Sequence, residues 1–238
     1  MMGAVFMLTL RQLTGRWRLI IMAVLAVMPV LFTALVVRSL SAPFVGQFEV
    51  LVLSTMLAGS IAPLIVVSIA SPVFANEIED RTLANLTLSP LQRWQIVAPK
   101  LGAAITVATP FVVGSAFFTS RIGFNQDVTA IFAVTTSAFI GLLMYAVVFV
   151  WLGLVTKQAI AVGLVYIVLW EGFFSGFVSG IRLFSVRHYA AALMHGMDPR
   201  RFANAEHVGS GVAISVAIAV FVLFFLLSVR RLRRMDVP

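Results

Sequence analysis

The 238-residue chain contains no cysteine, which excludes disulfides, thiol catalysis and thiolate metal sites. Charge is also scarce: Asp, Glu, Lys and Arg together make up 11% of the residues, against about a quarter in soluble domains. Hydrophobic residues make up 61%, and the mean hydropathy is +1.05. A soluble domain of this length could not bury so many apolar side chains, so the composition indicates a membrane protein.

Several catalytic motifs are missing as well. There is no G-x-x-x-x-G-K-[ST] phosphate loop, and neither Lys100 nor Lys157 follows a glycine. There is no G-x-S-x-G nucleophile motif. Three histidines and two acidic residues share one segment, but their spacing is not typical of a metal site, so we interpret them as interfacial polar residues. These five are His188, His195, Asp198, Glu206 and His207. We therefore expect a non-catalytic chain that binds no cofactor or metal itself.

Long apolar runs predict an all-α polytopic membrane protein that forms a single transmembrane domain over 1–238. Each run is long enough to cross about 30 Å of hydrocarbon, and backbone groups in lipid require helices. The predicted spans are 19–37, 50–74, 101–119, 128–153, 158–180 and 209–229.

The distribution of Lys and Arg predicts the orientation. With six spans and both termini in the cytoplasm, eleven basic residues lie inside and six outside, as the positive-inside rule favours. The last outer loop, 181–207, fits less well, because it carries Arg182, Arg187, Arg200 and Arg201. A five-span arrangement would bring that loop inside but would leave the basic tail 230–234 outside.

The first eighteen residues predict an amphipathic helix at the membrane interface. Phe6, Leu10, Leu13 and Trp17 fall on one helical face, and the arginines fall off it. A frayed tail before the first span is the alternative. The apolar run that follows is too long for a secretory signal peptide.

The stretch 76–100 interrupts the apolar sequence with Glu77, Glu79, Asp80, Arg81 and Arg93. Such a loop cannot lie in hydrocarbon. We expect two short helices in it, one over 77–86 and one that starts at the turn 88–92, where Ser89 can cap and Pro90 suits the first position. Leucines beside charges are typical of a docking surface for a cytoplasmic partner. A solvated loop that only stays out of the bilayer is equally compatible with the pattern.

Two motifs resemble those of ABC-2-type permeases, the transmembrane subunits of ATP-binding cassette (ABC) transporters. In the loop they are Glu77-Ile-Glu-Asp-Arg-Thr-Leu83, Leu86, Ser89-Pro90 and Lys100-Leu101. Near the fifth span they are Leu169-Trp-Glu-Gly172 and Leu183-Phe-Ser-Val-Arg-His-Tyr189. Together with the amphipathic start and the six spans, the resemblance extends over nearly the whole chain.

This resemblance implies a type V exporter fold with a cytoplasmic coupling helix between spans two and three and short outer helices within 181–207. It implies two ATPase subunits, which carry ATP and Mg, and a second permease protomer, identical or similar. The implied localisation is the bacterial inner membrane. The ATPase contact would comprise Glu77, Asp80, Arg81, Thr82 and Leu83, with Pro90 and Arg93 setting the following helix. The family often has Gly where Arg81 stands.

The fifth span contains the carboxylate Glu171 in apolar sequence. An ionisable residue there is costly, which suggests a substrate or proton contact; a carboxylate that reaches the outer interface, or pairs with Arg182 or Arg187, is the alternative. Gly172, Gly176 and Gly180 repeat every four residues, which predicts a packing face against a neighbouring helix or a second protomer.

Three functions follow. The first is the permease subunit of an ATP-driven exporter, with membrane lipid around it and no role for nucleic acid. The second is a membrane-embedded enzyme that uses Glu171 and the outer histidines on lipid-linked substrates. The third is a membrane anchor or assembly factor that recruits a cytoplasmic protein through 76–100. The transported substrate does not follow from the sequence.

Overall fold

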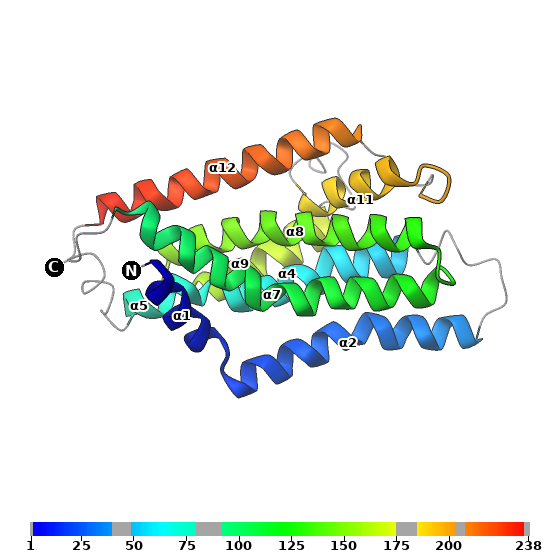
Figure 1. The fold of residues 1–238 in the computed structure, drawn as a ribbon, viewed down its shortest axis with the longest axis horizontal. Coiled ribbons are helices and arrows are strands. Elements are labelled where there is room, and N and C mark those ends of the chain that lie inside the picture. Colours follow the sequence, from blue (N-terminus) through cyan, green and yellow to red (C-terminus); the bar gives the residue numbers. More distant parts are fainter. Residues whose placement is uncertain (1, 40–48, 80–91, 175–184, 203–207, 236–238) are drawn as a thin grey trace.

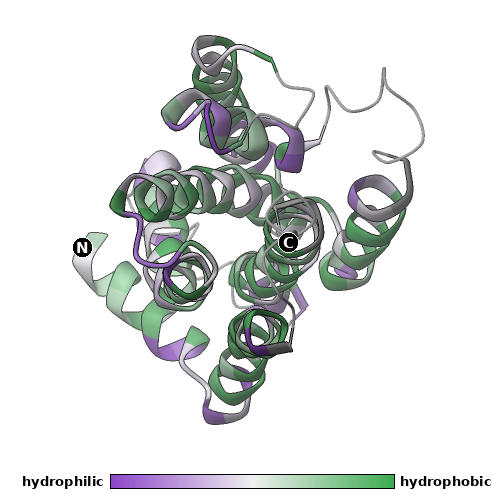
Figure 2. Ribbon diagram, turned by 90° about the vertical axis from the view of Figure 1, so that its right-hand side faces the viewer, coloured by the Kyte–Doolittle hydropathy of each residue, from purple (hydrophilic) through white to green (hydrophobic). Residues whose placement is uncertain are grey.

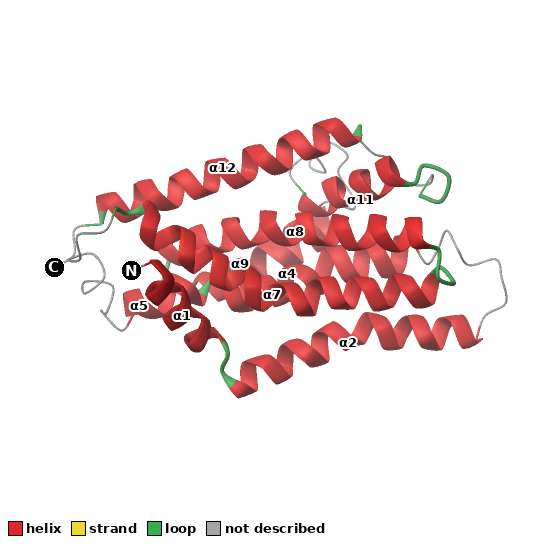
Figure 3. Cartoon of the chain, viewed as in Figure 1, coloured by secondary structure: helices red, strands yellow, loops and turns green. Residues whose placement is uncertain are grey.

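The computed structural model describes residues 2–39, 49–79, 92–174, 185–202 and 208–235, and the structural statements below concern these ranges. Within them every regular element is helical (Figure 3), as expected for an all-α protein. The first half of the chain forms α1 (Met2–Leu13), α2 (Arg16–Ser39), the π-helix η1 (Glu49–Ile61), α4 (Ala62–Ala70) and α5 (Pro72–Glu79). The second half forms α7 (Trp94–Gly123), α8 (Val128–Val155), α9 (Ala159–Val165), the π-helix η2 (Tyr166–Phe174), α11 (Val186–Met197) and α12 (Ser210–Arg234).

Five helices in the described ranges are long and apolar enough to cross a membrane, which supports a multi-pass membrane protein. They are Arg16–Arg38, Val52–Glu79, Trp94–Gly123, Val128–Val155 and Ser210–Arg234. The segment predicted as the fifth span forms a shorter apolar helix, Ala159–Gly172, and its predicted continuation to residue 180 lies outside the described residues.

The helices run roughly parallel to the long axis of the molecule, and the start of α1 and the end of α12 lie at the same end (Figure 1). α1 and α5 are found at this end, which we call the termini end. The turn between α7 and α8 lies at the opposite end. The chain therefore returns to its starting side.

α8 lies at the centre of the bundle and α2 and α12 lie at its periphery. α8 packs against α4, α7, α11 and α12, and 56% of its most apolar 18-residue stretch is buried inside the bundle. The corresponding shares for α2 and α12 are 22% and 17%. Viewed along the long axis, hydrophobic residues occupy most of the helical ribbon (Figure 2). Apolar side chains therefore face outward on the peripheral helices, as expected for surfaces covered by lipid or by another protein.

Two glycines allow the central helices to approach closely. A Cβ on Gly153 of α8 would lie 2.3 Å from the carbonyl oxygen of Ser71, between α4 and α5. A Cβ on Gly163 of α9 would lie 2.3 Å from Val67 Cγ2 of α4. Small residues of this kind let membrane helices make close backbone contact.

The N-terminal helix is shorter than the predicted 1–18. α1 ends at Leu13, Thr14 and Gly15 are not helical, and α2 begins at Arg16, because glycine has a low helix propensity. α1 buries Val5, Thr9 and Leu13 and packs against α7. Trp17 does not share that face: it lies in the first turn of α2 and is 78% exposed.

The third crossing begins earlier than predicted. Residues 94–100, which the sequence suggested were part of the loop, form the first turns of α7. Just before that helix, the amide of Gln92 donates a hydrogen bond to Oε1 of Gln95 (3.0 Å), the contact that a glutamine makes in a capping box at the start of a helix. Ser89 and Pro90 lie outside the described residues.

Candidate functional site

A buried ion pair joins the second and third crossings at the termini end. Nζ of Lys100 on α7 donates to Oε1 of Glu77 on α5 at 2.5 Å and to the carbonyl oxygen of Val73 at 3.1 Å. Lys100 is fully buried and Glu77 is 5% exposed. The ammonium also lies 4.8 Å from the ring centroid of Phe74. An unpaired charge in this apolar setting would be strongly destabilising, so each residue depends on the other.

The position of Glu77 changes its expected role. The resemblance implied that Glu77 touches an ATPase, but its carboxylate points into the bundle, where it holds Lys100. Arg93 is partly exposed just before α7. The other implied contact residues, Asp80, Arg81, Thr82, Leu83 and Pro90, lie outside the described residues. Their contact with a partner stays a prediction.

A second buried carboxylate, Glu171 of η2, binds the start of α11. Its Oε2 accepts a hydrogen bond from Oγ of Ser185 (2.5 Å), and its Oε1 accepts one from the amide of Val186 (3.0 Å). The hydroxyl of Tyr166 donates to Oε1 at 3.3 Å. Ser185 is the N-cap of α11, but its own side chain makes no cap bond. Glu171 therefore caps α11 from the preceding helix η2, because its oxygens accept hydrogen bonds from donors at the start of α11.

Glu171 is fully buried. Its side chain has no contact with solvent, so a role in a substrate pathway stays a prediction. The predicted partner Arg182 lies outside the described residues. The chemistry of the site is therefore that of an anchor: a carboxylate surrounded by hydroxyl and amide donors that fixes one helix on another.

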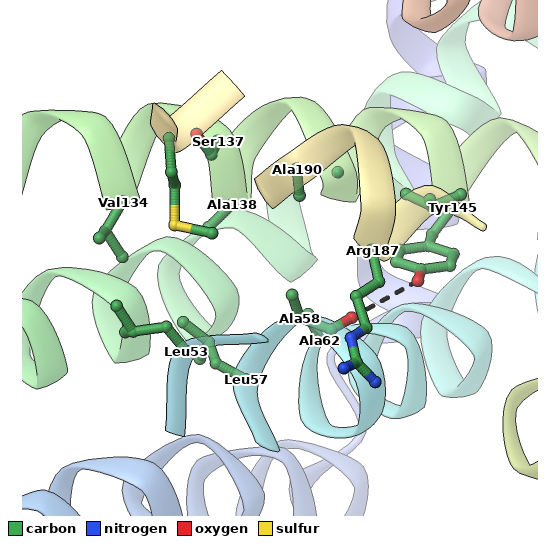
Figure 4. A pocket seen from close by; sticks show the side chains of 13 residues that line it. Leu53, Leu57, Ala58, Ala62, Val134, Ser137, Ala138, Tyr145, Arg187 and Ala190 are labelled. Carbon is green, nitrogen blue, oxygen red and sulfur yellow. Dashed lines mark hydrogen bonds between the residues drawn. The ribbon is translucent and has the colours of Figure 1, made fainter. Parts of the chain in front are cut away.

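The first turn of α11 also reaches the second crossing. Nε of Arg187 donates to Oγ of Ser54 on η1 at 2.9 Å. The Arg187 side chain lies over Gly59, where an added Cβ would come within 3.1 Å of its Cδ. Beside it, Tyr145 of α8 donates to the carbonyl oxygen of Ala58 at 3.4 Å (Figure 4). α11 is thus tied to η2 by Glu171 and to η1 by Arg187.

A small cavity lies beneath this turn. Figure 4 shows apolar side chains from η1, α8 and α11 around it, including Leu53, Val134 and Ala190, with Arg187 and Tyr145 at one side. Its volume is about 20 Å³, room for roughly one water molecule.

The predicted glycine face is described only at its first member. Gly172 is exposed, and among the described residues a Cβ there would meet a backbone oxygen of its own helix, that of Ile167, at 3.6 Å. Gly176 and Gly180 lie outside the described residues. Pairing with a second protomer through this face stays a prediction.

The described part of the predicted outer loop, 185–202, makes several polar contacts. Arg201 pairs with Asp127 at 2.8 Å and lies over the Phe124 ring. Asp127 is itself the N-cap of α8 and accepts bonds from the amides of Thr129 and Ala130. Nδ1 of His195 donates to the carbonyl oxygen of Phe202 at 2.7 Å. The described residues contain no group of three His, Asp or Glu placed to hold a metal ion; His207 and Glu206 lie outside them.

Compared with known protein families and with curated protein sequences, the chain matches none.

The sequence identified most of the residues at these sites but not the contacts between them. Lys100 and Glu77 were both part of the quoted motif, yet their pairing was not predicted. The available signal was two opposite charges at the facing ends of consecutive apolar spans, neither of which hydrocarbon tolerates alone. Gly153 and Gly163 were also missed; isolated glycines inside apolar helices indicate close packing.

Proposed function

We propose that this chain is the permease subunit of an ATP-driven ABC exporter of the ABC-2 type. The proposal rests on the motifs in 76–100 and near Glu171, and on the arrangement of the helices around them. Two copies, or this chain with a similar one, would form the transport pathway with two separate ATPase subunits. The exposed apolar faces of α2 and α12 supply surfaces for lipid and for a second protomer.

The course of the chain supports six crossings. The start of α1 and the end of α12 lie at one end of the bundle, which favours an even number of passes. We propose that the shorter apolar helix Ala159–Gly172 belongs to a sixth crossing beside the five long helices. If the start of α1 lies in the cytoplasm, the end of α5 and the start of α7 lie on the same side, and we expect the segment between them to be accessible to an ATPase.

One observation carries the proposal: the Glu77–Lys100 pair ties α5 to α7 immediately beside that segment. A partner that binds residues 80–91 and moves them would therefore act on two crossings that the ion pair holds together. Glu77 then has an indirect role, while Asp80, Arg81, Thr82 and Leu83 make the contact and Pro90 and Arg93 direct the helix that follows. The locked pair turns a local push into a movement of both helices, as coupling requires.

Co-purification from the native host in mild detergent tests the proposal. We expect an ATPase with a phosphate-binding loop to accompany the wild-type chain and to be lost from an Asp80→Ala/Leu83→Ala variant. Gln126→Ala, in the exposed turn at the opposite end, is the matched control and should retain the ATPase. Absence of any ATPase from the wild-type preparation would contradict the proposal. A different cytoplasmic protein, lost from the same variant, would instead support an anchor.

A further inference from the structure

A groove with three arginines lies between the last turns of α8 and α12, at the termini end. Trp151 and Val155 of α8 form one wall, and Leu227 and the arginines of α12 form the other. The arginines are Arg230, Arg231 and Arg234. The groove has a volume of about 430 Å³ and opens to the outside. We propose that it binds the headgroup of an anionic phospholipid.

The spacing on α12 gathers the basic groups on one side. Leu227, Arg230, Arg231 and Arg234 follow at i, i+3, i+4 and i+7, so they share one helical face. Nε of Arg231 lies 3.5 Å from the carbonyl oxygen of Leu154 in the last turn of α8, which holds this side chain against the groove wall. Guanidinium groups bind phosphate oxygens through two parallel hydrogen bonds, so this face fits a phosphodiester.

The depth of the groove fits a lipid headgroup. From Ser210 to Arg230, α12 rises about 30 Å, the thickness of the hydrocarbon core. The arginines therefore come where the helix leaves the hydrocarbon. Trp151 of α8 lines the same groove from its hydrocarbon side, and an edge-to-face contact with Phe224 at 5.2 Å between ring centroids fixes its ring. Tryptophan is enriched at this interface.

The mixed walls distinguish a phospholipid from a free anion. Trp151, Val155 and Leu227 provide apolar surface for the glycerol and the first carbons of the acyl chains, while the arginines receive the phosphate. Among the described residues that line the groove there is no carboxylate to neutralise the arginines. Each such basic group near an anionic surface adds about 1 kcal/mol of attraction. The inference requires only that the chain spans a membrane and does not depend on the exporter assignment.

Native mass spectrometry of the purified chain tests this inference. The probes are phosphatidylglycerol and phosphatidylcholine with identical acyl chains, and inorganic phosphate. We expect the wild type to retain phosphatidylglycerol preferentially, and Arg230→Gln/Arg234→Gln to bind it roughly 30-fold more weakly. Arg233→Gln is the charge-matched control, because Arg233 lies on the same helix but outside the groove, and it should bind nearly as the wild type does.

Three results would overturn the inference. Equal retention of the two lipids would mean that charge does not select the ligand. An equal loss in the Arg233→Gln control would mean that total charge, not the groove, decides. Displacement of the lipid by millimolar inorganic phosphate would mean that the site is a simple anion site. The melting curve of each variant, which should match that of the wild type because the three substituted arginines are exposed, excludes misfolding as the cause.

Discussion

Glu77 and Glu171 are both buried carboxylates in apolar surroundings, but the protein satisfies them in different ways. Glu77 meets a full positive charge on Lys100, whereas hydroxyl and amide groups from η2 and the start of α11 donate to Glu171. An ion pair can be removed as a unit and leaves no charge behind. Glu171 cannot be removed in this way, because one of its donors is a backbone amide. The Glu77–Lys100 pair therefore links two crossings through side chains that can be exchanged together. Glu171 instead holds the backbone at the start of α11 in place.

The largest effect is expected from removing one half of the ion pair. Lys100→Met leaves Glu77 buried without its cation, and we expect a loss of about 3–5 kcal/mol of unfolding free energy. Chemical unfolding in detergent micelles, followed by tryptophan fluorescence, measures it.

The matched control is the double variant Glu77→Leu/Lys100→Met, which removes both charges and keeps the volume. It should recover most of the stability lost in the single variant. If the double variant is as unstable as Lys100→Met, the two residues do not act as a pair.

Removing the second carboxylate should cost somewhat less. Glu171→Ala leaves the Ser185 hydroxyl and the Val186 amide buried without their acceptor, at about 2–4 kcal/mol in total. The companion variant Glu171→Gln keeps one acceptor oxygen and should lose about half as much. Hydrogen exchange at the first turn of α11 is the sharper readout, because it should rise in Glu171→Ala and remain near the wild-type rate in Lys100→Met. Equal exchange in the two variants would contradict the capping role.

A single donor to Glu171 is worth less than the carboxylate itself. Ser185→Ala removes one hydroxyl and leaves the bonds from Val186 and Tyr166 in place, so we expect a loss of about 1 kcal/mol. Ser54→Ala removes the hydrogen bond from Arg187, and its loss of unfolding free energy can be compared with that of Ser185→Ala. If Ser185→Ala lost as much unfolding free energy as Glu171→Ala, Ser185 alone would hold the carboxylate.

The smallest effect is expected at the carboxylate that remains partly exposed. The Arg201–Asp127 pair leaves about a third of each side chain in contact with solvent (35% and 31%). Water screens such a pair, and Arg201→Gln should therefore cost less than about 1 kcal/mol. The effect should shrink further in high salt, whereas that of Lys100→Met should not. A salt-independent loss at Arg201 would remove the distinction between buried and exposed pairs.

The sequence predicted the helical class and the multi-pass character, and five of the six predicted spans correspond to long apolar helices. It singled out Glu77, Lys100 and Glu171, but not the contacts that these side chains make. Apolar length determines crossings well, because hydrocarbon thickness sets a minimum for each. It predicts their ends poorly, as the α7 start at Trp94 and the break at Gly15 illustrate. Pairings such as Glu171 with Ser185 depend on how the chain returns after the fifth crossing, and no local pattern encodes that return.

Coupling as proposed requires that the segment beside the Glu77–Lys100 pair contacts an ATPase. Photocross-linking in cells, with a photoreactive amino acid at Leu83 and, as control, at Gln126 in the turn at the opposite end, tests it most directly. We predict a cross-link from position 83 to a protein with a phosphate-binding loop and none from position 126. No such cross-link from position 83, or equal cross-links from both positions, would contradict the claim.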